Sequence, residues 1–291
     1  MAQEKKLHKQ HKKAGNAAAY IVLILISIIW LFPFVCIVLQ SFRSYKLEPG
    51  GMVDYLLPKT FSLDSYKFLF SKDCQFFQWY GNTLIIAFFV AIGQTIMVLM
   101  VSYALSRMRF KGRELLMRFW LILGMFPGFL TMICLYFLLK NFGLTQQGAI
   151  PGLILISVAS SGMGYYVCKG FFDTIPVSLR EAAKLEGASE FTIFSKIVIP
   201  LSKPMIVYTV INSFLTPWMD FVMARLMIKS KDSADWTVAI GLFNLLQRSL
   251  IGDYFSVFCA GGIIVAIPIS ILFIIMQKFY VEGITGGAVK G

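Results

Sequence analysis

One acidic residue lies inside a segment that is otherwise apolar. Asp220 occurs in the run Phe-Leu-Thr-Pro-Trp-Met-Asp-Phe, residues 214–221. If this segment crosses a membrane, a charge at mid-depth costs about 2.5–3.5 kcal/mol, so Asp220 should face the protein interior or a cavity. Two interpretations remain open. Asp220 stabilises the helix bundle through an interhelical hydrogen bond, or it lines a pathway across the membrane.

Motifs for catalysis by the chain itself are absent from the sequence. No Gly-x-x-x-x-Gly-Lys-Ser/Thr loop for nucleotide phosphates occurs, and the closing Gly-Gly-Ala-Val-Lys-Gly resembles one only in composition. The spacing of the five cysteines fits neither a zinc site nor a disulfide framework. His8 and His11 lie too far from acids or cysteines to indicate a metal site. We therefore expect no catalytic residue, no metal and no cofactor bound by this chain.

A polar stretch in the second half of the chain carries its own helix signals. Ser178 and Glu181 have the spacing of a capping box, and Gly187 can adopt the left-handed conformation that ends a helix. Ser189 can cap a second helix, which we predict to end at Pro200. The stretch therefore predicts a short helix, a glycine bend and a second helix.

The polar stretch resembles the EAA loop of importer permeases, the membrane subunits of ATP-binding-cassette importers. It has a glutamate and two alanines, a glycine a few residues later, and an apolar residue before a proline. In that family the loop is cytoplasmic and forms a coupling helix, which docks in a groove on a separate ATPase subunit. The alternative, an amphipathic helix on the membrane surface, fits the alanine pair and the glycine poorly. The resemblance implies an ATPase-coupling role for Glu181, Ala182, Ala183, Leu185, Gly187 and Pro200.

Further segments extend the resemblance. Residues 218–221 are similar to the family's Trp-Asn-Asp-Phe signature, with Met219 in place of the asparagine, and the aromatic side chains there could stack on sugar rings. Residues 235–242 and the C-terminal glycine-rich run are similar to the smaller permease of maltose-type sugar importers, the MalG type. The resemblance implies pathway lining by Trp218, Asp220 and Phe221, contact with a sugar-binding protein at Asp235, Trp236 and Gly241, and ATPase contact at Gly286, Gly287 and Lys290.

The composition is that of a membrane protein. Of the 291 residues, 57% are hydrophobic and 14% are charged, whereas soluble domains carry about 25% charged residues. The net charge of +12 could indicate nucleic-acid binding, but the basic residues do not gather into one stripe with aromatic side chains. They lie instead at the ends of apolar segments, as membrane topology requires. We therefore expect no nucleic-acid partner.

Six apolar segments are long enough to cross a bilayer as helices, which takes about 20 residues. The first follows a basic head and offers no clear cleavage site, unlike a secretory signal. Short loops rich in Lys and Arg, above all residues 107–113, place both termini on the cytoplasmic side. The predicted divisions are a basic head at 1–16, a first helix at 17–41, an outer loop at 42–78, a permease core at 79–279 and a cytoplasmic tail at 280–291. The core holds five helices at 82–105, 119–139, 150–172, 204–227 and 254–279, with the coupling loop at 173–203 and an outer loop at 229–253.

The sequence thus predicts an all-α polytopic membrane protein with six transmembrane helices, both termini cytoplasmic and a cytoplasmic helix-bend-helix coupling loop. The resemblance implies a carbohydrate importer of the bacterial cytoplasmic membrane, with a maltodextrin-like oligosaccharide as cargo. Its expected partners are a second homologous permease, two ATPase subunits that hold ATP and Mg, an extracytoplasmic sugar-binding protein and membrane lipid. Another sugar or a glycerol phosphoester remains open as cargo. A secondary transporter would need more titratable residues inside the spans and repeated halves, and a membrane enzyme would need a catalytic cluster; the sequence shows none of these.

Overall fold

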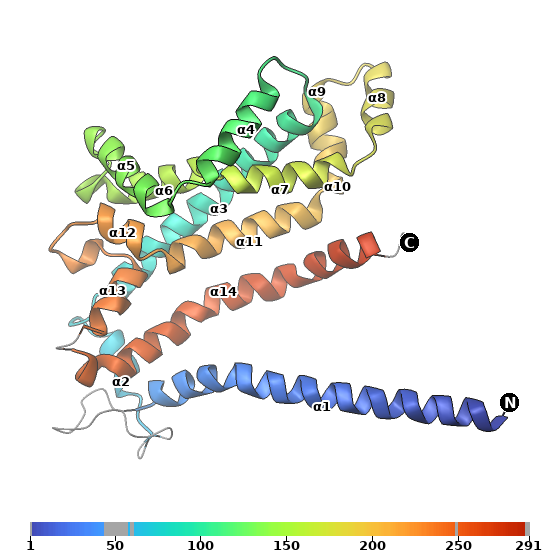
Figure 1. The fold of residues 1–291 in the computed structure, drawn as a ribbon. Coiled ribbons are helices and arrows are strands. Elements are labelled where there is room, and N and C mark those ends of the chain that lie inside the picture. Colours follow the sequence, from blue (N-terminus) through green and yellow to red (C-terminus); the bar gives the residue numbers. More distant parts are fainter. Residues whose placement is uncertain (1, 44–57, 59–60, 248–249, 289–291) are drawn as a thin grey trace. The chain divides into compact units, whose positions relative to one another are not determined.

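Long apolar helices dominate this computed structural model of the chain (Figure 1). The structure describes residues 2–43, 58, 61–247 and 250–288, and no strand occurs among them. The chain divides into two compact units. One comprises Met1–Cys74 with Asn244–Ile264, and the other comprises Gln75–Phe243 with Val265–Gly291.

One long helix, α3, organises the larger unit. Its buried side chains recur every three or four residues, as Ile86, Val90 and Val98 illustrate, so they form one stripe along the helix. Exposed apolar side chains such as Phe88 and Ile92 cover the opposite face. A helix that is apolar all round is typical of a membrane span. The stripe packs against three helices, so the central pack consists of α3 (Phe76–Arg107), α6 (Ala149–Ala159), α7 (Gly162–Asp173) and α11 (Lys203–Met219).

Within the described part of the chain, four helical segments are long and apolar enough to cross a membrane, and two bent helix pairs raise the number to six if each pair forms one span. By the length and composition of its helices the chain is therefore a polytopic membrane protein, as predicted. The four segments are Ala19–Ser41, Phe76–Arg107, Gln146–Asp173 and Ile251–Lys278. The bent pairs are α4 (Arg113–Gly124) with α5 (Gly128–Asn141), and residues Glu190–Leu201 with α11.

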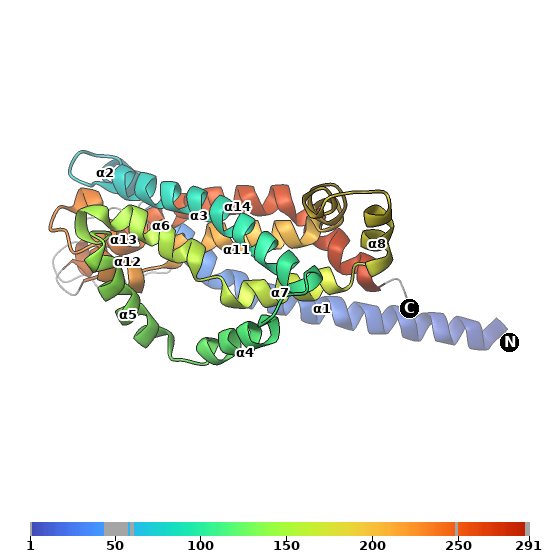
Figure 2. The ribbon, with the colours of Figure 1, turned by 90° about the horizontal axis from the view of Figure 1, so that it is seen from above.

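The bend between α4 and α5 measures 106° and falls at Met125–Pro127, inside the predicted span 119–139 (Figure 2). Pro127 directly precedes α5 and lacks the N–H that a continuous helix would need. A glycine on either side of this turn gives the backbone further freedom. The helix-breaking cluster in the sequence therefore corresponds to a real break.

The predicted continuous span at 204–227 is wrong, because the helix breaks at Asp220. Its ψ of 91° is extended, and a second helix, α12 (Val222–Met227), follows. The Oδ1 atom of Asp220 accepts a hydrogen bond from the backbone N–H of Met223 at 3.0 Å. A carboxylate that satisfies a free N–H at a helix start stabilises the new start, so Asp220 itself supports the break.

Several helices extend beyond their predicted limits. α1 (Ala2–Ser41) includes most of the predicted basic head, and α14 (Ile251–Ala288) includes most of the predicted tail. The predicted outer loop 229–253 contains a 3₁₀ turn, η3 (Ser233–Asp235), and a helix, α13 (Val238–Leu245). The predicted fourth span is interrupted between α6 and α7 at Ser160–Ser161.

In the smaller unit, the end of α1 contacts the short helix α2 (Asp64–Leu69). The Ser41 and Tyr66 hydroxyls share a hydrogen bond of 2.8 Å. The Ser65 hydroxyl donates to the backbone carbonyl of Arg43 at 2.7 Å. The Phe68 ring lies 5.3 Å from that of Tyr254, at the start of α14. Residues 44–57, 59 and 60 of the predicted outer loop 42–78 lie outside the described residues, so these contacts concern the rest of the loop.

Candidate functional site

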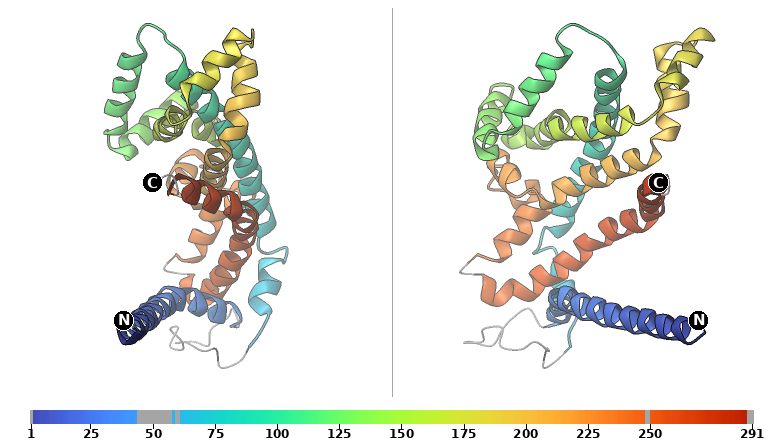
Figure 3. Two further views of the ribbon diagram at one scale, coloured as in Figure 1. Left: turned by 90° about the vertical axis from the view of Figure 1, so that its right-hand side faces the viewer. Right: turned by 45° about the vertical axis from the view of Figure 1, so that its right-hand side comes forward.

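The predicted helix, glycine bend and second helix are all present in the loop after α7. The first helix, α8 (Val177–Leu185), lies at one end of the larger unit (Figures 1 and 3). The second begins as α9 (Glu190–Ile193) and continues through a π-helical turn, Phe194–Val198, into α10 (Ile199–Leu201). These elements lie within the predicted coupling loop, residues 173–203.

Two of the predicted local signals act differently in the structure. α8 begins directly after Pro176 without a side-chain cap, so Ser178 and Glu181 form no capping box. Ser178 already lies inside the first turn, where its backbone cannot take the extended conformation of a cap. Pro200 lies inside the second helix instead of ending it. The widened π turn before Pro200 accommodates a residue that has no N–H and would clash with the carbonyl four residues earlier in an α-helix.

Gly187 ends α8 as predicted. Its φ is +84°, in the left-handed region that side chains with a Cβ atom disfavour. The N–H of Gly187 bonds to the carbonyl of Lys184 at 3.0 Å, and that of Ala188 bonds to the carbonyl of Ala183 at 2.9 Å. These two bonds form a Schellman motif, which satisfies the last carbonyls of the helix. No atom lies within 4 Å of the place where a Cβ of residue 187 would stand, so only the backbone conformation demands glycine there.

Glu190 connects the two helices of the coupling loop to the membrane helix α3. Its carboxylate accepts hydrogen bonds from the Arg180 guanidinium, from Lys184 Nζ at 2.7 Å and from the Tyr103 hydroxyl at 2.7 Å. Arg180 and Lys184 belong to α8, whereas Tyr103 belongs to α3. The hydrogen bond to Glu190 raises the pKa of Arg180 above its ordinary value. Three donors from two helices on one carboxylate fix the orientation of α8 relative to α3.

A second set of bonds holds the beginning of the coupling loop. The Arg107 guanidinium, at the end of α3, donates to the backbone carbonyls of Phe172 and Ile175. Asp173 accepts from the Ser106 hydroxyl and from Lys169 Nζ, both at 2.6 Å. The last turn of α7 is therefore fixed to the end of α3. A displacement of the coupling loop must consequently act on both helices.

The outward face of the coupling loop mixes charged residues with exposed apolar side chains that are hardly covered within the described chain. Ala183 is buried, but Glu181 and Ala182 are exposed and Leu185 has 91% of its surface exposed. Phe191, on α9, is 76% exposed. Residues two positions apart in a helix point about 200° away from each other. Phe191 therefore faces the opposite side of the helix from the buried Ile193.

Asp220 lies on the wall of a cavity of about 700 Å³ within the larger unit. The polar side chains around it come from α3, α5, the end of α6 and α11, and apolar side chains complete the wall. The cavity also reaches the bend between α4 and α5. Its polar lining consists of Gln94, Thr131, Ser157, Ser160, Thr216 and Asp220.

The two aromatic residues near Asp220 lie in packed surroundings. Trp218 is 4% exposed and its ring lies 5.3 Å from that of Tyr80. The Phe221 ring lies 4.2 Å from that of Phe243. Of the three predicted pathway residues, Asp220 alone lines the cavity. Pathway lining by Trp218, Asp220 and Phe221 stays a prediction.

Hydrogen bonds attach the predicted binding-protein loop to the start of α3. Asn82 Nδ2 donates to the carbonyls of Ala234 and Trp236, at 2.8 and 3.0 Å. Trp79 Nε1 donates to the carbonyl of Ser233 at 2.7 Å. The N–H of Val238 donates to the Thr83 hydroxyl at 2.8 Å. Four bonds to successive turns of one helix hold this loop in a defined conformation.

The three predicted binding-protein residues differ in accessibility. Asp235 is exposed, and Trp236 is half-buried with its ring stacked on Trp79 at 6.1 Å. Gly241 is buried, and a Cβ there would come closer than 3.0 Å to the Trp79 ring. Gly241 therefore serves packing within this chain, and contact with another protein stays a prediction. In the predicted tail, Gly286 and Gly287 lie in α14, whereas Lys290 lies outside the described residues.

Comparison with known proteins gives consistent matches along the chain. Galactooligosaccharides transport system permease protein GanQ of Bacillus subtilis (strain 168) is 35% identical over 278 residues, covering 94% of this chain and 95% of the relative. Maltodextrin transport system permease protein MdxG of the same organism is 32% identical, covering 95% and 97%. Maltose/maltodextrin transport system permease protein MalG of Escherichia coli (strain K12) is 30% identical, covering 96% and 97%.

A solved structure shares the fold. A chain of a bacterial ABC transporter involved in the import of the acidic polysaccharide alginate superposes with a TM-score of 0.74 at 22% identity, covering 92% of this chain and 97% of that chain. A family model described as a binding-protein-dependent transport system inner membrane component matches residues 97–285. This range holds the coupling loop, all of the Asp220 cavity wall except Gln94, and most of α14. The chain belongs to the family of inner membrane components of binding-protein-dependent transport systems.

Proposed function

We propose that this chain is a permease subunit of an ATP-driven, binding-protein-dependent oligosaccharide importer of the bacterial cytoplasmic membrane. It forms half of the translocation pathway with a second, homologous permease. Two separate ATPase subunits, which bind ATP and Mg, drive transport, and an extracytoplasmic sugar-binding protein delivers the cargo. The chain itself hydrolyses no ATP. Both termini and residues 107–113 lie on the cytoplasmic side.

The coupling loop is the single observation that carries this proposal. Its outward face presents Leu185, whose side chain makes almost no contact in the described chain. An exposed leucine on a short helix is unfavourable in water, and a groove on a partner protein would bury it. The bonds to Glu190 and Arg107 hold the helix firmly against α3 and α7. A rigid helix with an apolar end is suited to transmit a displacement from a partner to the membrane helices.

The cargo proposal relies on the relatives. GanQ, MdxG and MalG are named for galactooligosaccharides, maltodextrin and maltose with maltodextrin. Their common chemistry is a short, neutral chain of sugar rings. A cavity with hydroxyl and amide groups beside apolar side chains, as around Asp220, is compatible with such a cargo. The MalG-type assignment favours a maltodextrin-like oligosaccharide.

Co-purification followed by reconstitution tests the proposal. The chain should co-purify with a second permease and an ATPase, and vesicles of the complex should take up labelled maltotriose only with ATP and the binding protein. Uptake driven by a proton or sodium gradient without ATP would show a secondary transporter instead. Uptake of glycerol phosphoesters in place of oligosaccharides would overturn the cargo.

Accessibility labelling tests the proposed topology. Single cysteines at positions 67, 111 and 235 would be probed in intact cells with an impermeant thiol reagent, after replacement of the native cysteines. We expect labelling at 67 and 235 and protection at 111. Labelling at 111 with protection at 235 would reverse the proposed orientation.

A further inference from the structure

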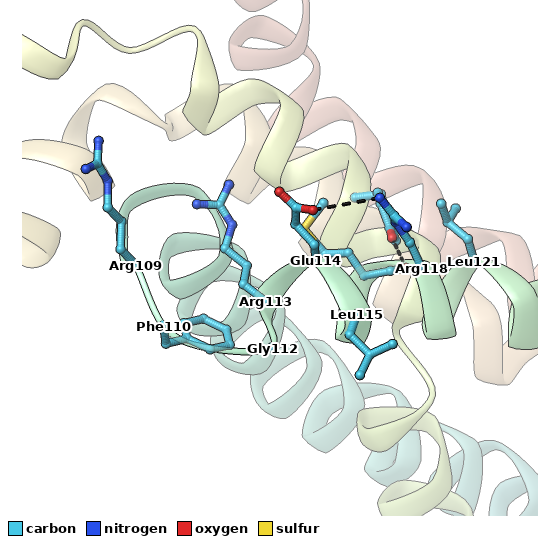
Figure 4. A pocket seen from close by; sticks show the side chains of 10 residues that line it. Arg109, Phe110, Gly112, Arg113, Glu114, Leu115, Arg118 and Leu121 are labelled. Atoms are coloured by element: carbon cyan, nitrogen blue, oxygen red, sulfur yellow. Dashed lines mark hydrogen bonds and ion pairs between the residues drawn. The ribbon is translucent and has the colours of Figure 1, made fainter.

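Two adjoining cavities lie where the end of α3 turns into α4. The first has a volume of about 840 Å³. Its wall runs from Arg109, in the turn before α4, to Leu121 on α4. The second, of about 610 Å³, lies between this turn and the coupling helix α8. Both cavities include Arg109 and Arg113 in their walls. Figure 4 shows these two guanidinium groups projecting to the same side of the ribbon, above the first cavity.

Positive charge dominates the second cavity. Arg107, Arg109, Arg113 and Arg180 line it, with Glu181 as its single carboxylate. Arg107 donates hydrogen bonds to backbone carbonyls, and Arg180 forms an ion pair with Glu190. Among the described residues, no ion pair involves Arg109 or Arg113. The nearby Glu114 turns towards Arg118 instead, at 3.8 Å (Figure 4).

The first cavity joins this charge to an apolar surface. Beyond Arg113 its wall on α4 comprises Leu115, Met117 and Leu121 together with the paired Glu114 and Arg118. Leu115 is 73% exposed, and no residue of α4 is buried. α4 is also the first half of a bent pair that could cross the membrane. The site therefore places two arginines without an ion-pair partner among the described residues at one end and exposed apolar side chains of α4 at the other.

We propose that Arg109 and Arg113 bind the phosphate of an anionic phospholipid, with an acyl chain lying along α4 beside Met117 and Leu121. Two guanidinium groups on one phosphate give several charge-assisted hydrogen bonds in a geometry that suits arginine. Anionic lipids enrich the cytoplasmic leaflet and attract basic residues there. The inference rests on the proposed function, which puts residues 107–113 on the cytoplasmic side. A soluble phosphate or an acidic protein segment would use the arginines but not the apolar wall.

Lipid retention by the purified complex tests the proposal. Complexes released from vesicles of phosphatidylcholine and phosphatidylglycerol in equal parts are analysed by native mass spectrometry, and bound phosphatidylglycerol is counted. We expect Arg109→Gln and Arg113→Gln each to reduce retention about fivefold, and the double variant about 25-fold, as loss of one and two sets of charge-assisted hydrogen bonds to the phosphate predicts. Arg109→Lys should lose less, because lysine keeps the charge but not the paired donors.

Lys111→Gln is the matched control. Lys111 lies in the same turn, is exposed and lines neither cavity, so its loss should leave retention within twofold of wild type. Equal losses in all three single variants would mean diffuse surface attraction and overturn the site. Unchanged retention in the double variant would overturn it as well. Melting temperatures in pure phosphatidylcholine should match wild type, which separates lost binding from lost folding.

Two further outcomes address other ligands. Inorganic phosphate that stabilises the complex as strongly as phosphatidylglycerol would identify a soluble anion and overturn the lipid assignment. Loss of the ATPase subunit from the double variant in pure phosphatidylcholine would identify an acidic protein segment instead. Failure of the proposed function would appear separately, as absent ATP-driven uptake by wild type in either lipid with retention unaffected.

Discussion

Gly187→Val should weaken the coupling loop through backbone strain alone. At φ +84° residue 187 is in the left-handed region, where a Cβ costs about 1–2 kcal/mol, and a β-branched side chain is at the upper end. No neighbouring atom lies within 4 Å of a Cβ there, so steric crowding adds nothing to this cost. A penalty of about 1–2 kcal/mol reduces the population of the native bend about 5- to 30-fold relative to wild type.

The assay compares ATPase activity and sugar uptake in the same reconstituted vesicles. We expect Gly187→Val to bind the ATPase subunits more weakly or to move several-fold less sugar per ATP hydrolysed, while the external binding protein still binds sugar normally. Gly187→Asn is the matched control, because asparagine tolerates the left-handed conformation, and it should stay close to wild type. A wild-type ratio for the valine variant would refute the reasoning. Equal defects in the valine and asparagine variants would show that any side chain at position 187 is harmful, and not the strain of a left-handed φ.

Three further changes follow from other contacts. Glu190→Gln removes the charge that holds Arg180 and Lys184, so it should lower the amount of sugar taken up per ATP hydrolysed. Glu186→Gln, which removes an equal charge at an exposed neighbouring position, should have a smaller effect, and equal effects would contradict this role of Glu190. Gly241→Ala forces a Cβ against the Trp79 ring and should cost about 1–3 kcal/mol, seen as a lower melting temperature of the complex; unchanged melting would show that the ring can move. Asp220→Asn keeps an acceptor for the Met223 N–H, so the complex should assemble while transport changes; loss of assembly would assign Asp220 to packing.

Local signals in the sequence predicted local structure well. Gly187 in the left-handed region and Ser189 as an N-cap are interactions within a few residues, and both are confirmed. The break at Asp220 was missed although its cause is also local, because the apolar pattern continues through it and dominated the prediction. The unused signal was an acidic residue three positions before a backbone N–H that needed an acceptor.

Contacts between distant residues could not be predicted in the same way. Glu190 meets Tyr103 across 87 residues of sequence, so its role depends on how α9 packs against α3. Position 241 requires glycine because the Trp79 ring occupies the space of a Cβ atom, and no residue near it in the sequence indicates this constraint. The exposure of Leu185 and Phe191 could be recognised only in the structure. These residues differ from the buried apolar residues of the coupling loop only in the side of a short helix on which they lie.

Site-specific photocrosslinking from the coupling loop tests the central claim most directly. A photoreactive amino acid at position 185, where the native leucine is 91% exposed, should crosslink to the ATPase subunit in native membranes. The same group at Leu179, on the same helix and 43% exposed, provides a comparison that reports the docked face. The account predicts a strong adduct with the ATPase from position 185 that disappears when the ATPase is not expressed. Adducts with lipid alone, with the ATPase present, would contradict it and make this loop a membrane-surface helix.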